Sequence, residues 1–426
     1  MPEDGRYPTP LAAELADDVL ERFLRYVRID TQSDELSETY PSTSKQRDLG
    51  ELLARELREL GLEDAAIDEH GYVFATLPGV RGPTLGLIAH VDTSPDESGA
   101  NVQPQVVHYE GGDIQLPGDP RQVIRPSESV LLGEKVGHEI VTTDGKTLLG
   151  ADDKAGVAEI MGAVAYLAGH PELEHAPVRI GFTVDEEVGR GVDHFDIEQF
   201  GADFAYTFDG AKVGQIDEET FSASEVTIRI EGHSVHPGTS KGKLVNSVKL
   251  AASLVERLPK DRLSPETTDE REGFVHPHRI VGGAAEATVT FIVRDFDGQK
   301  LKQHEQLLRD LAADIEREEP RARVTVERED SYHNMKEFLD SRPRILEAAE
   351  EAARRVGLEP SRTAIRGGTD GAMLSARGLL TPNIYTGGQE YHSVLEWVSV
   401  QDMAVSSATA VELAKLLAEP EWAEST

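Results

Sequence analysis

Three short apolar segments, each closed by acidic or histidine residues, constrain the fold more than any other feature of the sequence. The segments and their closing residues are 84–90 with His90, 178–184 with Asp185-Glu186-Glu187, and 203–208 with Asp209. Continuous apolar runs of this length are typical of strands buried on both faces of a parallel sheet. Because binding sites of open α/β sheets gather at the carboxyl ends of strands, we predict a site at one sheet edge.

The pattern changes near residue 221, where a second domain is predicted. The order strand, helix, strand, helix, strand is indicated for residues 225–231, 243–258, 287–294, 299–315 and 322–328. Patterns of the α/β type resume after this block. The sequence therefore predicts an α/β fold whose main domain, a mixed sheet flanked by helices, comprises residues 1–220 and 334–426. Residues 221–333 are predicted to be an inserted α+β domain.

Helices are predicted at 15–27 and 45–60 from their apolar spacing. Residues 1–14 contain three prolines and show no periodicity, so a loose arm is expected there. The irregular, glycine-rich segment 99–146 is expected to form short hairpins near the site.

Composition limits the kinds of partner. The 43 Lys and Arg against 78 Asp and Glu give a formal net charge of -35, which argues against nucleic acid and anionic membranes as partners. No cysteine is present, so any metal must be held by His, Asp and Glu. The sequence has no run near the roughly 20 apolar residues of a membrane span and no signal pattern at its start, and a cytoplasmic location is expected.

The acidic excess is spread along the chain. Because salt screens repulsion between like charges, this distribution suggests adaptation to a high-salt interior. Greatest stability at low salt would contradict that hypothesis.

His90 and Asp92 are the first candidate site residues. With the period of two in a strand, both side chains lie on one face. A carboxylate there can hydrogen-bond the imidazole nitrogen that faces away from a metal and so orient the ring. A structural or exposed histidine remains an equal alternative from this motif alone.

The adjacent carboxylates Glu186 and Glu187 are the second candidate. Neighbouring strand residues point to opposite faces, unless the backbone turns sharply, so one could ligate a metal while the other moves protons. The alternative is a solvated strand end before a glycine turn. Asp152 and Asp153 precede a predicted helix at 154–167, where one can cap the helix and the other ligate.

Eight motifs occur together in one order. They are His90-Val-Asp92-Thr-Ser-Pro, Gly150-Ala-Asp152-Asp-Lys-Ala-Gly, Asp185-Glu186-Glu187-Val-Gly, Asp209-Gly, Val235-His236-Pro-Gly-Thr, Arg294-Asp-Phe-Asp, Arg366-Gly-Gly-Thr-Asp-Gly-Ala and Tyr391-His392. From about Leu15 to the last predicted helix, the chain resembles the M20 family of metallopeptidases, and within it the tripeptide aminopeptidases.

This resemblance implies a zinc-peptidase-like catalytic domain with two Zn²⁺ per subunit. His90 and Asp209 would hold one ion, Glu187 and His392 the other, and Asp152 would bridge them. Each ion would keep a position for water or substrate, as catalytic zinc requires.

The resemblance also implies roles in catalysis. Glu186 would be the general base and acid, Asp92 would orient His90, and a zinc-bound hydroxide would attack the peptide. Asp153 is expected to be mainly structural, and Asp185 is expected to be a strand-end carboxylate without a chemical role.

His236 and Arg366 are the implied substrate-binding residues. His236 would act across a homodimer formed through the inserted lid or dimerisation domain, and Arg366 would hold the carboxylate of a short peptide. The alternatives are a turn residue for His236 and a structural ion pair for Arg366. Glu396 is expected to support its loop or the substrate amine.

The implied function is release of the N-terminal residue from tripeptides. A second interpretation is another M20-type amidohydrolase, such as a dipeptidase or an N-acyl amino acid deacylase. A third is a metal-stabilised protein that binds short peptides without catalysis and has no need of Glu186.

Overall fold

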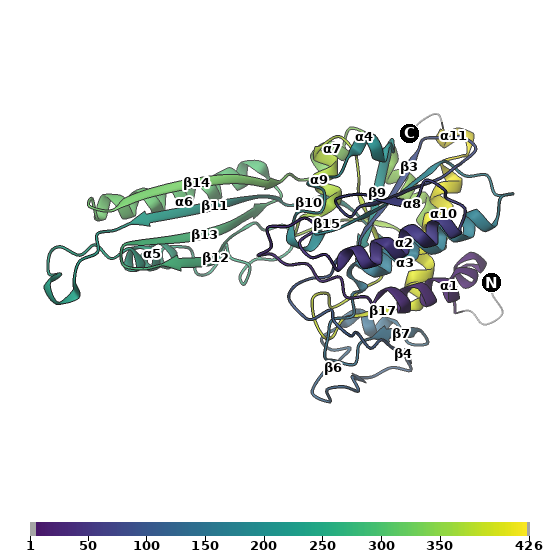
Figure 1. Ribbon diagram of the computed structural model, residues 1–426, viewed down its shortest axis with the longest axis horizontal. Helices are drawn as coiled ribbons and strands as arrows, with labels where there is room; N and C mark the ends of the chain where they lie inside the picture. The colour runs from purple at the N-terminus through teal and green to yellow at the C-terminus, as the bar shows by residue number, and fades with distance from the viewer. Residues whose placement is uncertain (1–5, 424–426) are drawn as a thin grey trace. The chain divides into compact units, whose positions relative to one another are not determined.

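The computed structural model describes residues 6–423 and divides into two compact units (Figure 1). The second unit consists of Glu219–Glu337 and Ala364–Gly368, and the first contains the remainder of the chain. The predicted insertion at 221–333 lies inside the second unit. The five residues 364–368 were not predicted there, and a hydrogen bond of 3.2 Å from Phe221 N to Ile365 O joins them to it.

The first unit is built on an eight-stranded mixed sheet, which confirms the predicted fold class. Its strands, in spatial order, are β1 (Ala66–Ile67), β2 (Val73–Leu77), β8 (Val178–Thr183), β3 (Leu85–His90), β9 (Phe204–Gly210), β16 (Asn383–Tyr385), β10 (Gln215–Thr220) and β15 (Ser361–Ile365). The central strand β3 runs parallel to β8 and β9. Every residue of β3 is buried, as its unbroken apolar sequence predicts.

Helices cover the sheet of the first unit. The longer ones are α1 (Pro10–Tyr26), α2 (Gln46–Glu59), α3 (Ala151–Gly169), α8 (Arg344–Arg355) and α10 (Val400–Leu416). The helices α1, α3 and α10 pack on one another, and α3 lies on β3 and β9 (Figure 1). Short helices α4 (Ile197–Phe200), α9 (Asp370–Ala376) and α11 (Pro420–Ala423) complete this unit, with α7 (Lys336–Leu339) at its border.

The predicted loose arm at 1–14 is wrong from residue 10 onward. Thr9 accepts a hydrogen bond of 3.3 Å from Ala12 N, and Pro10 occupies the first helical turn of α1. A proline is favourable at that position because the first amides of a helix have no intrahelical acceptor. Residues 1–5 lie outside the described part of the chain.

Residues 99–146 form short strands, as expected for an irregular segment. A three-stranded sheet contains β17 (Trp397–Ser399), β7 (Glu139–Thr142) and β4 (Gln105–His108), and a hairpin contains β5 (Ile114–Gln115) and β6 (Val123–Ile124). Trp397 is fully buried in a small core with Tyr109 and Leu132. This core fixes β17, which directly follows the loop of His392.

The second unit is a four-stranded antiparallel sheet with two helices. The spatial order is β12 (Phe274–Gly282), β13 (Glu286–Asp295), β11 (Ser222–Glu231) and β14 (Arg323–Tyr332). Val226, Ile228 and Ile230 share a buried face, in the same core as residues of α5 (Ser247–Glu256) and α6 (Gly298–Glu318). The edge strand β12 was not among the predicted strands, and it contains Pro277, which an edge strand tolerates.

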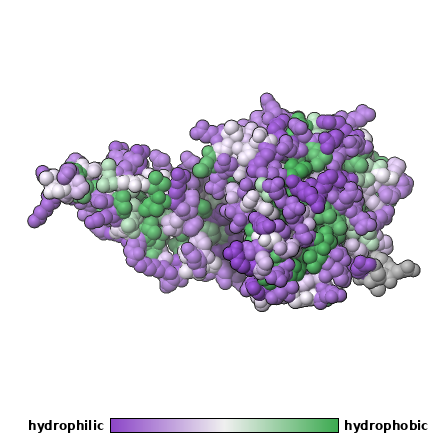
Figure 2. Space-filling view, turned by 60° about the horizontal axis from the view of Figure 1, so that its bottom comes forward, coloured by the Kyte–Doolittle hydropathy of each residue, from purple (hydrophilic) through white to green (hydrophobic). Residues whose placement is uncertain are grey.

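The surface is mainly hydrophilic in the view of Figure 2, in keeping with the acidic composition. None of the helices described for residues 6–423 has the length and hydropathy that a membrane span requires.

Candidate metal centre

The carboxyl ends of three neighbouring strands in the first unit bring the candidate ligands together. His90 ends β3, Glu187 follows β8, and Asp209 lies at the end of β9. Asp152 stands at the start of α3, and His392 comes from the loop between β16 and β17. Two groups of potential ligands result, His90 with Asp152 and Asp209, and Asp152 with Glu187 and His392.

Asp152 belongs to both groups and faces both imidazoles. Its Oδ1 lies 3.0 Å from His90 Nε2, and its Oδ2 lies 3.4 Å from His392 Nε2. His90 Nε2 is also 3.7 Å from Asp209 Oδ1, and His392 Nε2 is 2.9 Å from Glu187 Oε2. Two oxygens of one carboxylate that face two histidines have the arrangement of a bridging ligand.

Asp92 connects the first imidazole to the acidic pair. Its Oδ1 lies 3.3 Å from His90 Nδ1, on the side of the ring that faces away from Asp152. Its two oxygens also accept hydrogen bonds from the main-chain amides of Glu186 and Glu187 at 3.1 and 3.2 Å. Asp92 is fully buried and therefore sits where it can orient His90 and the acidic pair together.

The backbone turns sharply at Asp185, so strand alternation does not decide how Glu186 and Glu187 point. Asp185 has φ 57° and ψ 24°, in the left-handed region, and a single 3₁₀ turn follows at Glu186–Val188. Glu186 Oε2 comes within 4.0 Å of His90 Nε2, whereas Glu187 Oε2 lies against His392. The two carboxylates thus lie near different histidines.

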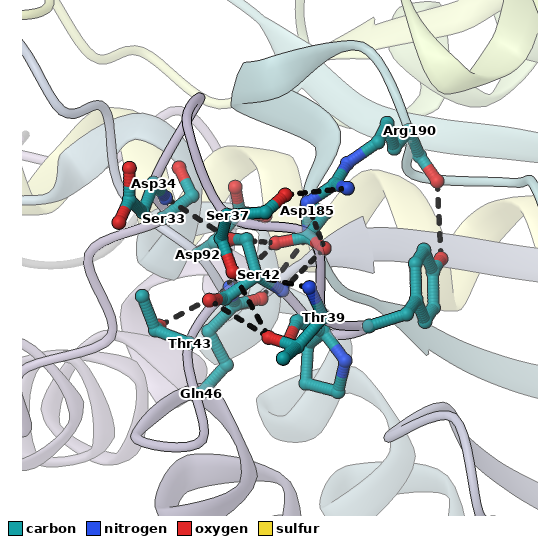
Figure 3. A network of polar contacts seen from close by, with 12 residues as sticks. Ser33, Asp34, Ser37, Thr39, Ser42, Thr43, Gln46, Asp92, Asp185 and Arg190 are labelled. Atoms are coloured by element: carbon teal, nitrogen blue, oxygen red, sulfur yellow. Dashed lines mark hydrogen bonds and ion pairs between the residues drawn. The ribbon is translucent and has the colours of Figure 1, made fainter.

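Asp185 itself is fully buried and is therefore not a solvated strand end, and the contacts found for it are structural ones. Figure 3 shows its side chain inside a network with Ser42, Gln46 and Arg190.

Neighbours of Asp152 hold its backbone in place. The buried carboxylate of Glu396 accepts hydrogen bonds from the amides of Leu149, Gly150 and Asp152 at 2.7, 2.8 and 3.0 Å. Of the two roles expected for Glu396, these contacts are those of loop support. Asp153 accepts a hydrogen bond of 3.1 Å from His90 N, which is the structural role expected for it.

Burial, neighbouring charges and hydrogen bonds shift the pKa values of the titratable groups in the cluster. Burial, with the nearby charge of Asp209, raises the pKa of Glu186 well above its ordinary value. Burial and the charge of Asp152 raise the pKa of Glu187 to about 8. Burial alone would raise the pKa of Asp152, but hydrogen bonds from His392 and His90 lower it. Hydrogen bonds to Asp152 and Glu187 raise the pKa of His392 to about 11.

This concentration of buried carboxylates fits a pair of cations. Glu187 Oε1 is buried and has no hydrogen-bond partner among residues 6–423, so it is free to accept a metal. Imidazole nitrogens with carboxylate oxygens and no thiolate are a donor set that suits Zn²⁺. The residues present therefore fit a dinuclear metal site.

Two carboxylates near this cluster were not identified from the sequence as site residues. Asp96 Oδ2 lies 3.2 Å from His392 Nδ1, on the side of the ring that faces away from Glu187. Asp370 Oδ2 accepts a hydrogen bond of 2.7 Å from Thr183 Oγ1 at the end of β8. Asp370 belongs to the quoted Arg366 motif, but no spacing signal connects Asp96 to His392.

The two implied substrate-binding residues lie in the second unit. His236 is exposed, and its Nδ1 accepts a hydrogen bond of 3.2 Å from Gly238 N in a turn at Pro237–Thr239. Arg366 donates to the carbonyl oxygens of Glu270 and Glu272 at 3.0 and 2.9 Å, and to Thr268 Oγ1 at 3.1 Å. Arg366 is therefore bound by main-chain carbonyls rather than by the carboxylate of a structural ion pair.

Comparisons with known proteins agree with the fold and with the family resemblance. Residues 219–320 match the family model described as a peptidase dimerisation domain of the M20 type. The chain is 45% identical to peptidase T of Geobacillus thermodenitrificans over 406 residues, which cover 94% of this chain and 98% of that protein. Identity to peptidase T of Bacillus subtilis is 44% over 405 residues, with the same coverage of both chains.

Solved structures share the fold. The crystal structure of aminopeptidase PepT from Bacillus cereus matches with a TM-score of 0.73 and 22% identity, over 95% of this chain and 99% of that one. The Bacillus subtilis YXEP protein, described as a dinuclear metal-binding peptidase from the M20 family, matches with a TM-score of 0.66 and 16% identity, over 97% and 100%. With nearly half of its residues identical to curated relatives over almost their full length, the chain belongs to the peptidase T family of M20 peptidases.

Proposed function

We propose that this protein is a dinuclear zinc aminopeptidase that releases the N-terminal residue from tripeptides. The observation that carries the proposal is that Asp152 faces His90 and His392 with its two oxygens while Glu186 lies beside the same cluster. Relatives named peptidase T, a structural neighbour named aminopeptidase and another described as dinuclear support the same function.

In this proposal, two residue groups would hold the Zn²⁺ pair: His90 with Asp209, and Glu187 with His392, with Asp152 available to both groups. The bound metal would supply the Lewis acidity that polarises a peptide carbonyl and makes water acidic enough to attack.

Glu186 would take the proton of the attacking water and return it to the departing amine. Its amide is fixed by Asp92, so its carboxylate starts from a defined backbone position. Asp92 would keep the Nδ1 side of His90 occupied, which leaves Nε2 to face the metal.

His236 would stabilise the oxyanion of the tetrahedral intermediate, and Arg366 would bind the carboxylate of the peptide. Because the terminal nitrogens of Arg366 already donate to Glu270, Glu272 and Thr268, a substrate carboxylate would have to replace some of these acceptors.

A homodimer through the second unit is part of the proposal. Its support is the match to a dimerisation domain and the exposed edge strand β12, where Ile280 and Val281 are both 55% exposed. Val248 on α5 is also exposed, and Figure 2 shows hydrophobic residues gathered on the face of this unit where α5 and β12 lie. A second copy that extends the sheet at β12 would cover them.

The test of the proposed base is Glu186→Gln, with metal content measured beside hydrolysis of a tripeptide. The expected result is an unchanged zinc content and a rate lower by at least about 10²–10⁴-fold, the usual contribution of general acid–base catalysis. Retained hydrolysis would contradict the role of Glu186.

The substrate class is tested on the wild-type protein loaded with zinc. Dipeptides, tripeptides, tetrapeptides and N-acyl amino acids are compared by kcat/KM, and the tripeptides are expected to be preferred. A preference for dipeptides or acyl amino acids would favour another amidohydrolase, and tight binding of peptides without turnover would favour a binding protein.

A further inference from the structure

We propose that Asp185 is the positioning residue that sends Glu186 and Glu187 to different halves of the metal centre. The inference rests on the proposed function, in which Glu186 moves protons and Glu187 binds metal. The contacts found for Asp185 are with Ser42, Gln46 and Arg190 and not with the proposed ligand atoms, so its effect would be exerted through the backbone of the two residues that follow it.

The conformation of Asp185 sets the direction of the acidic pair. Strand β8 ends at Thr183, and the left-handed backbone of Asp185 turns the chain directly into the 3₁₀ turn of Glu186 and Glu187. An extended residue at this position would continue the strand and give the pair the simple alternation of a sheet. A non-glycine residue in the left-handed region is uncommon, although aspartate tolerates it better than most.

Both carboxylate oxygens of Asp185 accept hydrogen bonds, from donors in two segments of the chain. Oδ2 accepts from Ser42 N at 2.6 Å and from Arg190 Nη2 at 3.3 Å. Oδ1 accepts from Gln46 Nε2 at 2.7 Å and also from the hydroxyl of Ser42. A fully buried carboxylate with four donors is held rigidly, and Figure 3 shows these contacts converging on it.

Gln46 forms hydrogen bonds with both the side chain and the main chain of Asp185. Its Oε1 accepts a hydrogen bond of 3.0 Å from Asp185 N, while its Nε2 donates to Oδ1. The orientation of this amide follows from chemistry, because Asp185 N can only donate. Helix α2, which begins at Gln46, is thereby tied to the end of β8.

The acidic turn is held from two sides. Gln46 and Ser42 fix Asp185, and Asp92 accepts the next two amides of the chain, those of Glu186 and Glu187. The main chain of the turn therefore has little freedom to rotate. Glycine could adopt the left-handed conformation of this turn equally well. The buried carboxylate of Asp185 is therefore needed to hold the turn in its place against Ser42 and Gln46, and not to give the turn its conformation.

The experiment compares two substitutions that separate these contributions. Asp185→Gly keeps access to the left-handed conformation but removes all four acceptor contacts. Asp185→Asn keeps the size of the side chain, and asparagine also tolerates the left-handed conformation. However, the NH₂ group of the new side chain would face Gln46 Nε2, which is also a donor. Both variants are expected to lose about 10–100-fold in zinc affinity and in kcat, the usual cost of removing a group that supports metal ligands.

A second substitution at Gln46 tests whether the loss in Asp185→Asn can be reversed. Gln46→Glu alone places a carboxylate against Asp185 and is expected to impair the enzyme. In the double variant Asp185→Asn with Gln46→Glu, the new carboxylate accepts from the Asn amide and still accepts from the main-chain amide of residue 185. The double variant is therefore expected to recover most of the zinc affinity and kcat that Asp185→Asn loses.

Glu56→Gln is the matched control, at the other end of α2. Glu56 is a mostly buried carboxylate that accepts from Tyr26 Oη at 2.6 Å and from Arg22 at 2.9 Å, away from the ligands. Its substitution is expected to lower the free energy of unfolding while kcat and zinc affinity of the folded protein stay unchanged. A defect of Asp185 that is only structural would give this same result.

Wild-type zinc affinity and kcat in Asp185→Gly, or no recovery in the double variant, would overturn the inference. Failure of the proposed function gives a different result, namely a wild-type protein that binds zinc but hydrolyses no peptide. In that case the zinc affinities of the variants still test whether Asp185 positions Glu187.

Discussion

Asp92 and Glu186 are joined by a hydrogen bond of 3.1 Å from the main-chain amide of Glu186 to Oδ1 of Asp92. The same carboxylate lies 3.3 Å from His90 Nδ1. One buried side chain thus connects the backbone of the proposed base to the orientation of a proposed ligand. The side chain of Asp96, in contrast, contacts the ring of His392 and is largely exposed.

Asp92→Ala is expected to reduce both zinc affinity and kcat by about 10–100-fold, because it frees two amides of the acidic turn and removes the carboxylate beside His90 Nδ1. The main-chain carbonyl oxygen of residue 92, 3.1 Å from the same nitrogen, then remains as the acceptor for the ring. Zinc competition and steady-state kinetics at saturating zinc would measure the two effects. Asp96→Ala is the matched control and is expected to have a smaller effect, since water can replace an exposed carboxylate. Equal effects of the two substitutions would contradict the central role of Asp92.

Removal of metal is expected to lower the thermal stability of the protein. Without cations, the largely buried carboxylates of Asp152, Glu187 and Asp209 repel one another. Ligands that bind only the folded state stabilise it by RT ln(1 + [L]/Kd), which is about 4.1 kcal/mol at 1,000 times Kd. Calorimetry with chelator and with re-added zinc, at constant ionic strength, would measure the change in Tm.

His392→Ala is the control for that measurement. It removes one imidazole from the second ligand group and is expected to reduce the stabilisation that zinc gives. An identical Tm with and without chelator in the wild-type protein would show that no metal contributes to the folded state.

The sheet edge that carries the candidate site could be predicted from the sequence, because the signals are short segments of neighbouring residues. The apolar segments of β3, β8 and β9 each end beside a chemical group, and parallel strands bring such ends together. His90, Glu187 and Asp209 were identified on this basis. Asp152 was a candidate together with Asp153 at the start of a predicted helix. The choice of Asp152 as the ligand, and the identification of His392, depended on the order of the motifs.

Supporting roles were predicted for Asp92, Asp153 and Glu396, but the partners of Asp185 and Glu396 could not be, because they are distant in the sequence. Asp185 and its partner Ser42 are 143 positions apart, and Glu396 and Leu149 are 247 positions apart. No periodicity connects such pairs. Glu186 and Glu187 do point in different directions, but a sharp turn at one left-handed residue, the exception allowed for, takes the place of strand alternation.

His236→Ala is expected to lower kcat without loss of zinc, because His236 lies in the second unit and contributes to neither ligand group. His233→Ala is the matched control and is expected to remain active, since the contacts found for His233 are main-chain hydrogen bonds with Val245. Mixed dimers of His236→Ala and Glu186→Gln subunits should recover part of the activity if His236 acts across the dimer. Absence of recovery in verified mixed dimers would contradict action in trans.

A pH-dependent contribution to stability is expected from Glu159, which lies in α3 and is fully buried. Ser406 Oγ lies 2.7 Å from both Glu159 Oε2 and the carbonyl oxygen of Tyr385. A hydroxyl has one proton, so if it donates to the carbonyl, Glu159 must donate to it as a neutral acid. Burial raises the pKa of Glu159 well above its ordinary value of 4.5, in agreement with this arrangement.

The sign of the effect follows from proton linkage. With a pKa raised in the folded state, Glu159 contributes full stability below its ordinary value of 4.5, and this contribution is lost as pH rises through the raised value. Glu159→Gln keeps a donor for Ser406 Oγ but cannot ionise. Denaturant unfolding from pH 5 to pH 9 should show the variant gaining stability relative to wild type as pH rises. A difference between the two proteins that stays constant with pH would show that Glu159 is not a buried neutral acid.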